Sequence, residues 1–101
     1  MVKHIILWQL KDEYSEEEKA NIKKGMKEGL ESLCGKVPGL LEARVRYDGL
    51  ASSTAEVMLD SAFTDEAALK AYKHHPEHVK VADGKVRPFV KTRVCMDYTM
   101  Q

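Results

Sequence analysis

The chain has few thiols, no net charge and no long apolar run. Its two cysteines, Cys34 and Cys95, lie far apart and form neither a CxxC pair nor a zinc-ribbon spacing. A disulfide framework therefore has no support, and reduced thiols in a cytoplasmic protein are expected. Sixteen basic residues balance sixteen acidic ones, and neither sign forms a long block. Binding to nucleic acid or to an anionic membrane through bulk charge is not expected.

The sequence also contains no segment typical of membrane insertion or export. The apolar run in residues 1–10 is interrupted by His4 and Gln9, is too short for a signal sequence, and has no small-residue cleavage site. No membrane association is therefore predicted. At 101 residues the chain is expected to form a single domain, residues 1–101, around one core.

Apolar periodicity predicts four strands and two main helices. Ser15 and Glu18 form a capping-box signature, followed by an apolar stripe from Ile22 to Leu33. A proline at position 76 is expected to break the second helix, which follows a Thr-Asp-Glu cap at residues 64–66. The predicted strands cover residues 2–10, 40–47, 55–63 and 89–100. The order βαββαβ predicts a ferredoxin-like α+β fold, with a four-stranded antiparallel sheet and helices on one face.

The first strand is apolar on both of its faces. Val2, Ile6 and Trp8 share one face, while Ile5 and Leu7 lie on the other. A sheet that helices cover on one side should expose its second face to water, so an apolar second face needs another cover. We therefore expect a homodimer that forms through the sheet faces.

Gly25 and Gly29 lie four residues apart within the first predicted helix. Each costs up to about 1 kcal/mol relative to alanine unless a close backbone approach compensates. Close packing of another element is the favoured explanation, with neutral drift and ligand access as alternatives.

Residues 71–79 hold three of the four histidines together with a tyrosine and a proline. Imidazole has an unperturbed pKa of about 6.5, so both protonation states are accessible near neutrality, and a neighbouring phenol can donate or accept a proton. This segment is the strongest candidate for chemistry. His78 has three interpretations: a structural hydrogen bond, proton transfer or ligand binding, and metal ligation.

The other candidates carry similar alternatives. Tyr72 is expected on the core side of its helix, either as packing or as a functional hydroxyl. His75 is expected at the helix end before the proline, and His4 in the core, at an interface or in a pocket. A zinc site of His74, His75 and His78 is not favoured, because the proline breaks helical spacing and no thiol or carboxylate completes a known pattern.

The remaining basic and sulfur-containing residues have a simpler interpretation. Arg44, Arg46, Arg87 and Arg93 are expected to be solvated or to lie at a dimer edge, and the sequence does not place them in one anion-binding cleft. The methionines of the predicted strands are expected to fill the interior of a barrel.

Together these features resemble one family, the stress-responsive α/β-barrel domain, often abbreviated Dabb. The similarity spans nearly the whole chain, and its most specific part is the Lys-His opening combined with a His-Pro-x-His segment. The matching segments are Val2–Leu7, Ser15–Glu18, Val37–Gly39, Phe63 with Asp65–Leu69, Ala71–Tyr72 with His75–Val79, Val86–Phe89, and Val94–Tyr98.

The resemblance implies a dimeric α+β barrel in which two ferredoxin-like sheets pack face to face. A plant polyketide cyclase of this family performs a cofactor-free intramolecular aldol condensation with a tyrosine and a histidine. These correspond to Tyr72 and His78 here, which become the candidate catalytic residues. His4 corresponds to a pocket-lining histidine and, with His75, is a candidate substrate-binding residue. A hydrophobic carbonyl or phenolic ligand is implied, with no cofactor and no metal.

Two other functions stay open. The chain could be a non-catalytic dimeric stress or housekeeping protein whose histidines and tyrosine only stabilise the fold. It could also oxidise phenols with oxygen and no cofactor, an alternative that rests on fold analogy alone.

Overall fold

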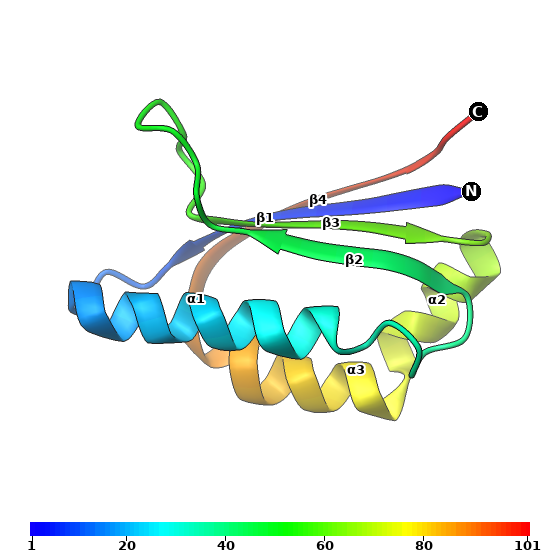
Figure 1. Cartoon of the computed structure of the whole chain (residues 1–101), viewed down its shortest axis with the longest axis horizontal. Helices are drawn as coiled ribbons and strands as arrows, with labels where there is room; N and C mark the ends of the chain where they lie inside the picture. Colours follow the sequence, from blue (N-terminus) through cyan, green and yellow to red (C-terminus); the bar gives the residue numbers. More distant parts are fainter.

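The computed structural model describes all residues, 1–101, as one antiparallel sheet with helices on one side (Figure 1). The strand order β2-β3-β1-β4 and the element order βαββαβ confirm the predicted ferredoxin-like fold. No helix is both long and apolar enough to cross a membrane. The strands are β1 (Val2–Leu10), β2 (Leu40–Arg46), β3 (Val57–Phe63) and β4 (Val90–Thr99); the helices are α1 (Glu16–Glu31), α2 (Glu66–His74) and α3 (Pro76–Val81).

The predicted capping box begins α1. The Glu18 backbone N–H donates to the Ser15 hydroxyl over 3.1 Å, and the Ser15 N–H donates to the Glu18 carboxylate over 2.9 Å. These bonds satisfy two of the donors that a helix N-terminus leaves free. The stripe that follows buries Met26 and Leu30, and Leu33 is buried just beyond the end of the helix.

Close helix packing explains one of the two glycines in α1. A Cβ atom at Gly29 would lie 3.0 Å from Cγ1 of Val81, at the end of α3. A Cβ at Gly25 would meet only the flexible side chain of Lys85, at 3.7 Å. Gly29 therefore lets α1 and α3 approach each other, whereas Gly25 has no such role.

The alternation within residues 40–47 needs a correction. In the sequence it sets Leu41, Ala43, Val45 and Tyr47 against three charged residues and so predicts them on the inner face, but Leu41 is 55% exposed and Tyr47 is also exposed. The pairing of β2 with β3 shifts register between Leu40 and Glu42. This irregularity adds a residue to β2, so Leu40 is buried in place of Leu41.

The proline break occurs where it was predicted. His75 has an extended backbone, with φ −67° and ψ 132°, and Pro76 is the first residue of α3. The His75 Nδ1 atom accepts a hydrogen bond from the Glu77 backbone N–H at 3.1 Å. After α3 the chain continues through a π-helical turn, Ala82–Val86, and a 3-10 turn, Arg87–Phe89, into β4.

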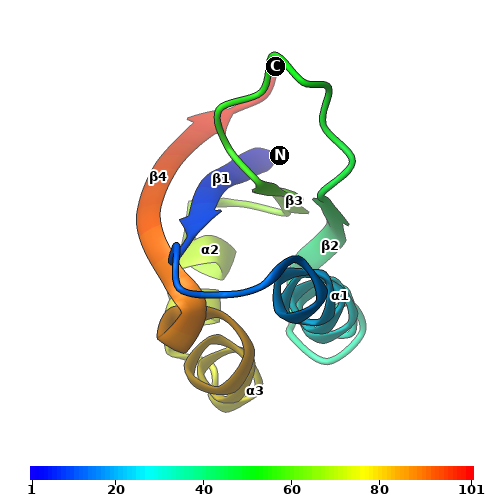
Figure 2. The same cartoon turned by 90° about the vertical axis from the view of Figure 1, so that its left-hand side faces the viewer.

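The two faces of the sheet have different surroundings. Alternate residues of β1 from Val2 to Leu10 are buried beneath the helices. The opposite face carries no helix, and the loop of residues 47–56 projects on that side (Figure 2). We define the outer apolar face as Ile5, Leu7, Met58, Val94, Met96 and Tyr98, which are paired neighbours on β3, β1 and β4. Val94 and Met96 are 63% and 67% exposed.

Candidate functional site

A cavity lies between the helices and the inner face of the sheet, with a volume of about 620 Å³. This is within the size range of pockets that hold small molecules. Of its 15 lining residues, nine are hydrophobic and none is an aspartate or a glutamate. The lining residues are His4, Ile6, Trp8, Leu30, Leu59, Tyr72, Lys73, His74, His78, Val79, Ala82, Val86, Arg87, Val90 and Arg93.

Tyr72 and His78 stack against each other in the wall of this cavity. Their ring centroids are 4.1 Å apart, with an interplanar angle of 36°. Tyr72 comes from α2 and His78 from α3, so the break at Pro76 sets their relative position. The Nδ1 atom of His78 is enclosed without a hydrogen-bond partner, and the residue lines the cavity.

Burial keeps both rings uncharged near neutrality. Loss of water lowers the pKa of His78, an effect that the Lys73 backbone partly opposes and that the positive charges of Arg87 and Arg93 reinforce. Burial raises the pKa of Tyr72 well above its ordinary value. The site thus offers a neutral imidazole that can accept a proton and a neutral phenol that can donate a hydrogen bond.

A second imidazole, His4 on β1, is held by a carboxylate. Its Nδ1 atom is hydrogen bonded to Oδ1 of Asp97 on β4, and its ring lies 6.1 Å from that of Tyr72. Burial lowers the pKa of His4 despite the opposing effect of Asp97. The Asp97 pKa is lowered overall, because its hydrogen bond with His4 and nearby positive charge outweigh its burial. A bond through Nδ1 orients the ring and leaves Nε2 for the cavity.

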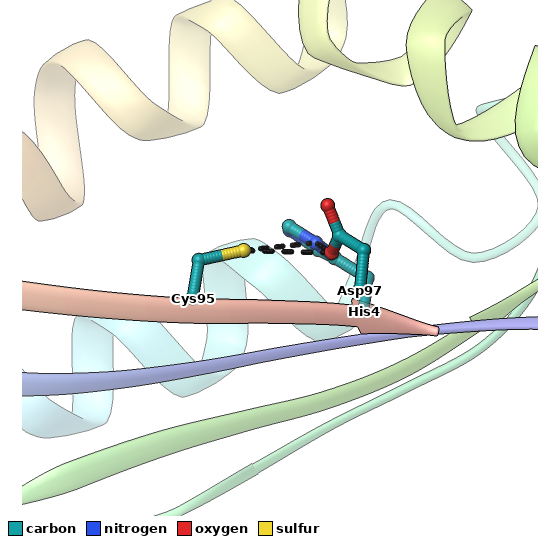
Figure 3. Close-up of side chains that lie close together, drawn as sticks. All are labelled: His4, Cys95 and Asp97. Atoms are coloured by element: carbon teal, nitrogen blue, oxygen red, sulfur yellow. Dashed lines mark hydrogen bonds and ion pairs between the residues drawn. The ribbon is translucent and has the colours of Figure 1, made fainter. Parts of the chain in front are cut away.

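Cys95 completes a small cluster with these two residues (Figure 3). Its Sγ atom lies 3.7 Å from Nδ1 of His4 and 3.4 Å from Oδ1 of Asp97. Histidine, thiolate and carboxylate are zinc ligands, and these three could approach one ion. However, the Lys73 ammonium lies 3.8 Å from Asp97, so positive charge opposes a divalent cation there. Burial raises the pKa of the Cys95 thiol, and the hydrogen bond and negative charge of Asp97 raise it further.

The structure brings three of the four predicted site residues together. His78, Tyr72 and His4 all line the cavity, whereas His75 does not. His75 caps α3 with its ring nitrogen, a local structural role that its position before Pro76 explains. His74 reaches the cavity from the exposed side of α2.

Sequence reasoning did not identify Asp97 and Cys95 as members of the site. Alternation placed both on one face of the last strand and His4 on one face of the first. The missing information was the register, which pairs His4 with Asp97 and Ile6 with Cys95. The ferredoxin-like fold places the first and last strands side by side and antiparallel. Aligning the apolar residues of these two strands would have placed Asp97 and Cys95 near His4.

Comparison with known proteins gives one family and one fold. A family model described as the stress responsive A/B barrel domain matches residues 2–100. No curated protein matches the chain. A dimeric protein of unknown function with a ferredoxin-like fold, from Bacteroides fragilis NCTC 9343, is 31% identical with a TM-score of 0.90. The alignment covers 98% of this chain and 95% of that protein.

Two more distant structures share the fold alone. A hydroxynitrile lyase from Passiflora edulis is 17% identical, with a TM-score of 0.74 and coverage of 99% of this chain and 93% of the lyase. A candidate antibiotic biosynthesis monooxygenase from Nitrosomonas europaea is 16% identical, with a TM-score of 0.73 and coverage of 99% and 98%.

Proposed function

The chain belongs to the stress-responsive A/B barrel domain family, and from this premise we propose that it is a homodimeric enzyme that needs no cofactor. Its substrate is a small hydrophobic carbonyl or phenolic compound bound in the cavity. The reaction is proton removal next to a carbonyl, followed by aldol-type carbon–carbon bond formation. The observation that carries this proposal is the stacked, uncharged Tyr72–His78 pair in the wall of an apolar cavity.

Each member of the pair has one role. Nε2 of His78 takes the proton from the carbon next to the carbonyl, and the Tyr72 hydroxyl donates a hydrogen bond to the enolate oxygen that forms. The enolate carbon then attacks a second carbonyl of the same molecule, and the proton on His78 returns to the new alkoxide. Positioned proton transfer contributes about 100- to 10,000-fold. This suits a substrate whose carbon is already acidified by a neighbouring carbonyl.

His4 supports the pair as a substrate-binding residue. Its ring is fixed by Asp97 and lines the cavity, with its centroid 6.1 Å from that of the Tyr72 ring. We assign it to the second carbonyl, where it would hold the oxygen in line for attack. Asp97 acts through His4 and is a positioning residue.

The homodimer is proposed to form through the outer apolar face. Several large apolar side chains are exposed there on neighbouring strands, which is unusual for a surface that meets only water. The relative from Bacteroides fragilis is described as dimeric. Because the cavity lies on the helix side of the sheet, a dimer formed through the outer apolar face does not cover it.

The activity test uses a linear aryl δ-diketone, whose intramolecular aldol closure and dehydration give an absorbing cyclohexenone. The wild-type protein should accelerate closure, and His78→Gln and Tyr72→Phe should each lower turnover about 100-fold or more. His75→Asn is the matched control, because asparagine keeps the helix cap outside the cavity. Its turnover should stay within about twofold of wild type.

Full turnover in both cavity variants would overturn the proposal. So would the absence of any acceleration by folded wild-type protein across a series of δ-diketones and β-keto compounds. That second result would favour the non-catalytic alternative, in which both substitutions lower the melting temperature and no ligand raises it.

A further inference from the structure

We propose that the cavity is selective for apolar anions, namely small molecules that carry one carboxylate on an aromatic or alkyl body. This inference rests on the proposed function only in placing the ligand in the same cavity. It adds a property that neither the Tyr72–His78 pair nor the fold implies, which is the sign of the ligand's charge.

The charge of the cavity wall is of one sign. Lys73, Arg87 and Arg93 all line the cavity, and no carboxylate residue does. They reach it from separate elements, since Lys73 lies on α2, Arg87 in the turn before β4 and Arg93 on β4. This concentration is local, because the chain as a whole has a formal net charge of zero. A wall of one charge sign raises the local concentration of ligands with the opposite charge.

The three cations are not equally available. Arg87 is paired with Asp83 at 2.5 Å, and Lys73 has a longer contact of 3.8 Å with Asp97. The side chain of Arg93 makes no ion pair and no hydrogen bond, although it lines the cavity. The guanidinium group presents donors in a planar fork that matches a carboxylate. Arg93 is therefore the primary anion contact, with Lys73 as a second one.

The remainder of the wall suits an apolar body. Arg93 is paired in register with Trp8, which also lines the cavity and is almost fully buried. Leu30, Val79 and Val86 face the same space from the helices and the turn. A ligand that places its ring among these residues brings its carboxylate to Arg93. Arg93 itself is exposed, so water partly screens this contact and its contribution to binding is moderate.

Fluorescence of Trp8, the single tryptophan of the chain, reports binding directly. The probes are para-ethylbenzoate, its neutral primary amide and para-ethylbenzylamine, which share one body and differ in charge. The wild-type protein should bind the carboxylate about tenfold more tightly than the amide, and the amine most weakly. Arg93→Gln should remove that tenfold preference, because it removes one partly exposed charge-assisted hydrogen bond to the carboxylate. Arg93→Lys keeps a positive charge and should retain part of the preference.

The control is Lys24→Gln, which removes one positive charge from the exposed side of α1 and should leave the preference unchanged. Equal binding of carboxylate and amide by the wild type, or an equal loss for both ligands in Arg93→Gln, would overturn anion selectivity while leaving the cavity as a ligand site. Binding of none of the three probes would contradict both this inference and the proposed function.

Discussion

At the scale of single residues, removal of water from His78 and Tyr72 prepares the site. The cost of burying a charge holds the imidazole neutral and the phenol protonated, and their rings stack at 4.1 Å. Aromatic pairs of this kind contribute about 0.5–1.5 kcal/mol beyond area burial. The same contact therefore stabilises the fold and sets the protonation states that proton transfer requires.

The first prediction concerns pH. Burial lowers the pKa of His78, and the charges of Arg87, Arg93 and His4 that face it act in the same direction. Its NMR titration should therefore have a midpoint below the ordinary value of 6.5. Between the two values the unfolded chain binds more protons, so stability is present above pH 6.5 and falls as the pH drops through this window. His4 has a lowered pKa as well and adds to the loss.

Two measurements check the sign of this effect. Urea unfolding midpoints should decrease on acidification below about pH 6.5, and the decrease should be smaller in His78→Gln, which cannot titrate. A His78 midpoint at or above 6.5, or identical pH dependence in both proteins, would contradict the account.

The candidate residues differ in how far the sequence could identify them. Tyr72 and His78 lie within one short segment, so a motif exposes them. Asp97 lies 93 positions from His4, and only the β1–β4 register brings the two together. Register depends on the packing of whole strands, so periodicity places a residue on a face without naming its partner.

At the scale of elements, the break between α2 and α3 creates the site. Residues six positions apart in a continuous helix are separated by about 120° around its axis, so their side chains diverge. Here the helix is interrupted, because His75 has an extended backbone and Pro76 begins α3. The interruption lets the two rings meet. The proline alone predicts the break, whereas the angle between the helices depends on how α3 packs against α1.

The second prediction compares the two glycines of α1. Gly25→Ala should raise the free energy of unfolding by up to about 1 kcal/mol, because alanine has the higher helix propensity and the site has room. Gly29→Ala should gain less or lose stability, because its Cβ would meet Val81 at 3.0 Å. Urea denaturation of both variants measures the difference. Equal stabilisation would show that α1 and α3 do not need the close approach.

The extra residue in β2 marks another limit of pattern analysis. Alternation alone predicted that Leu41 would be inside, and the register shift beside it reverses that expectation. Pro38 and Gly39 come just before the irregularity, but they are typical of the turn that precedes the strand and do not show that Leu41 is the extra residue. The outcome depends on how β2 meets β3 and the core.

At the scale of the whole molecule, the sheet separates two surfaces. The cavity lies on the helix side, and the outer apolar face lies on the other. The two-sided first strand predicted this division, since Ile5 and Leu7 needed a cover that the helices do not supply. The volume and charge of the cavity were beyond sequence analysis, because they depend on side chains from three strands, three helices and the turns before β4.

The third prediction tests the dimer. Met96→Lys places an unpaired charge in the middle of the outer apolar face, which should cost at least about 3 kcal/mol on association and weaken dimerisation more than 100-fold. Ala71→Lys adds the same charge on the exposed side of α2 and serves as the control. Analytical ultracentrifugation should find monomers for the first variant and dimers for the second and for wild type. Unchanged dimers in Met96→Lys would place the interface elsewhere.

The central claim is that His78 removes a proton next to a carbonyl, and exchange of that proton with deuterated solvent measures this step without any ring closure. NMR of phenylacetone in deuterium oxide should show faster loss of its α-proton signal with wild-type protein, an acceleration that His78→Gln removes and His75→Asn retains. Acceleration by folded His78→Gln equal to that of wild type would contradict the account.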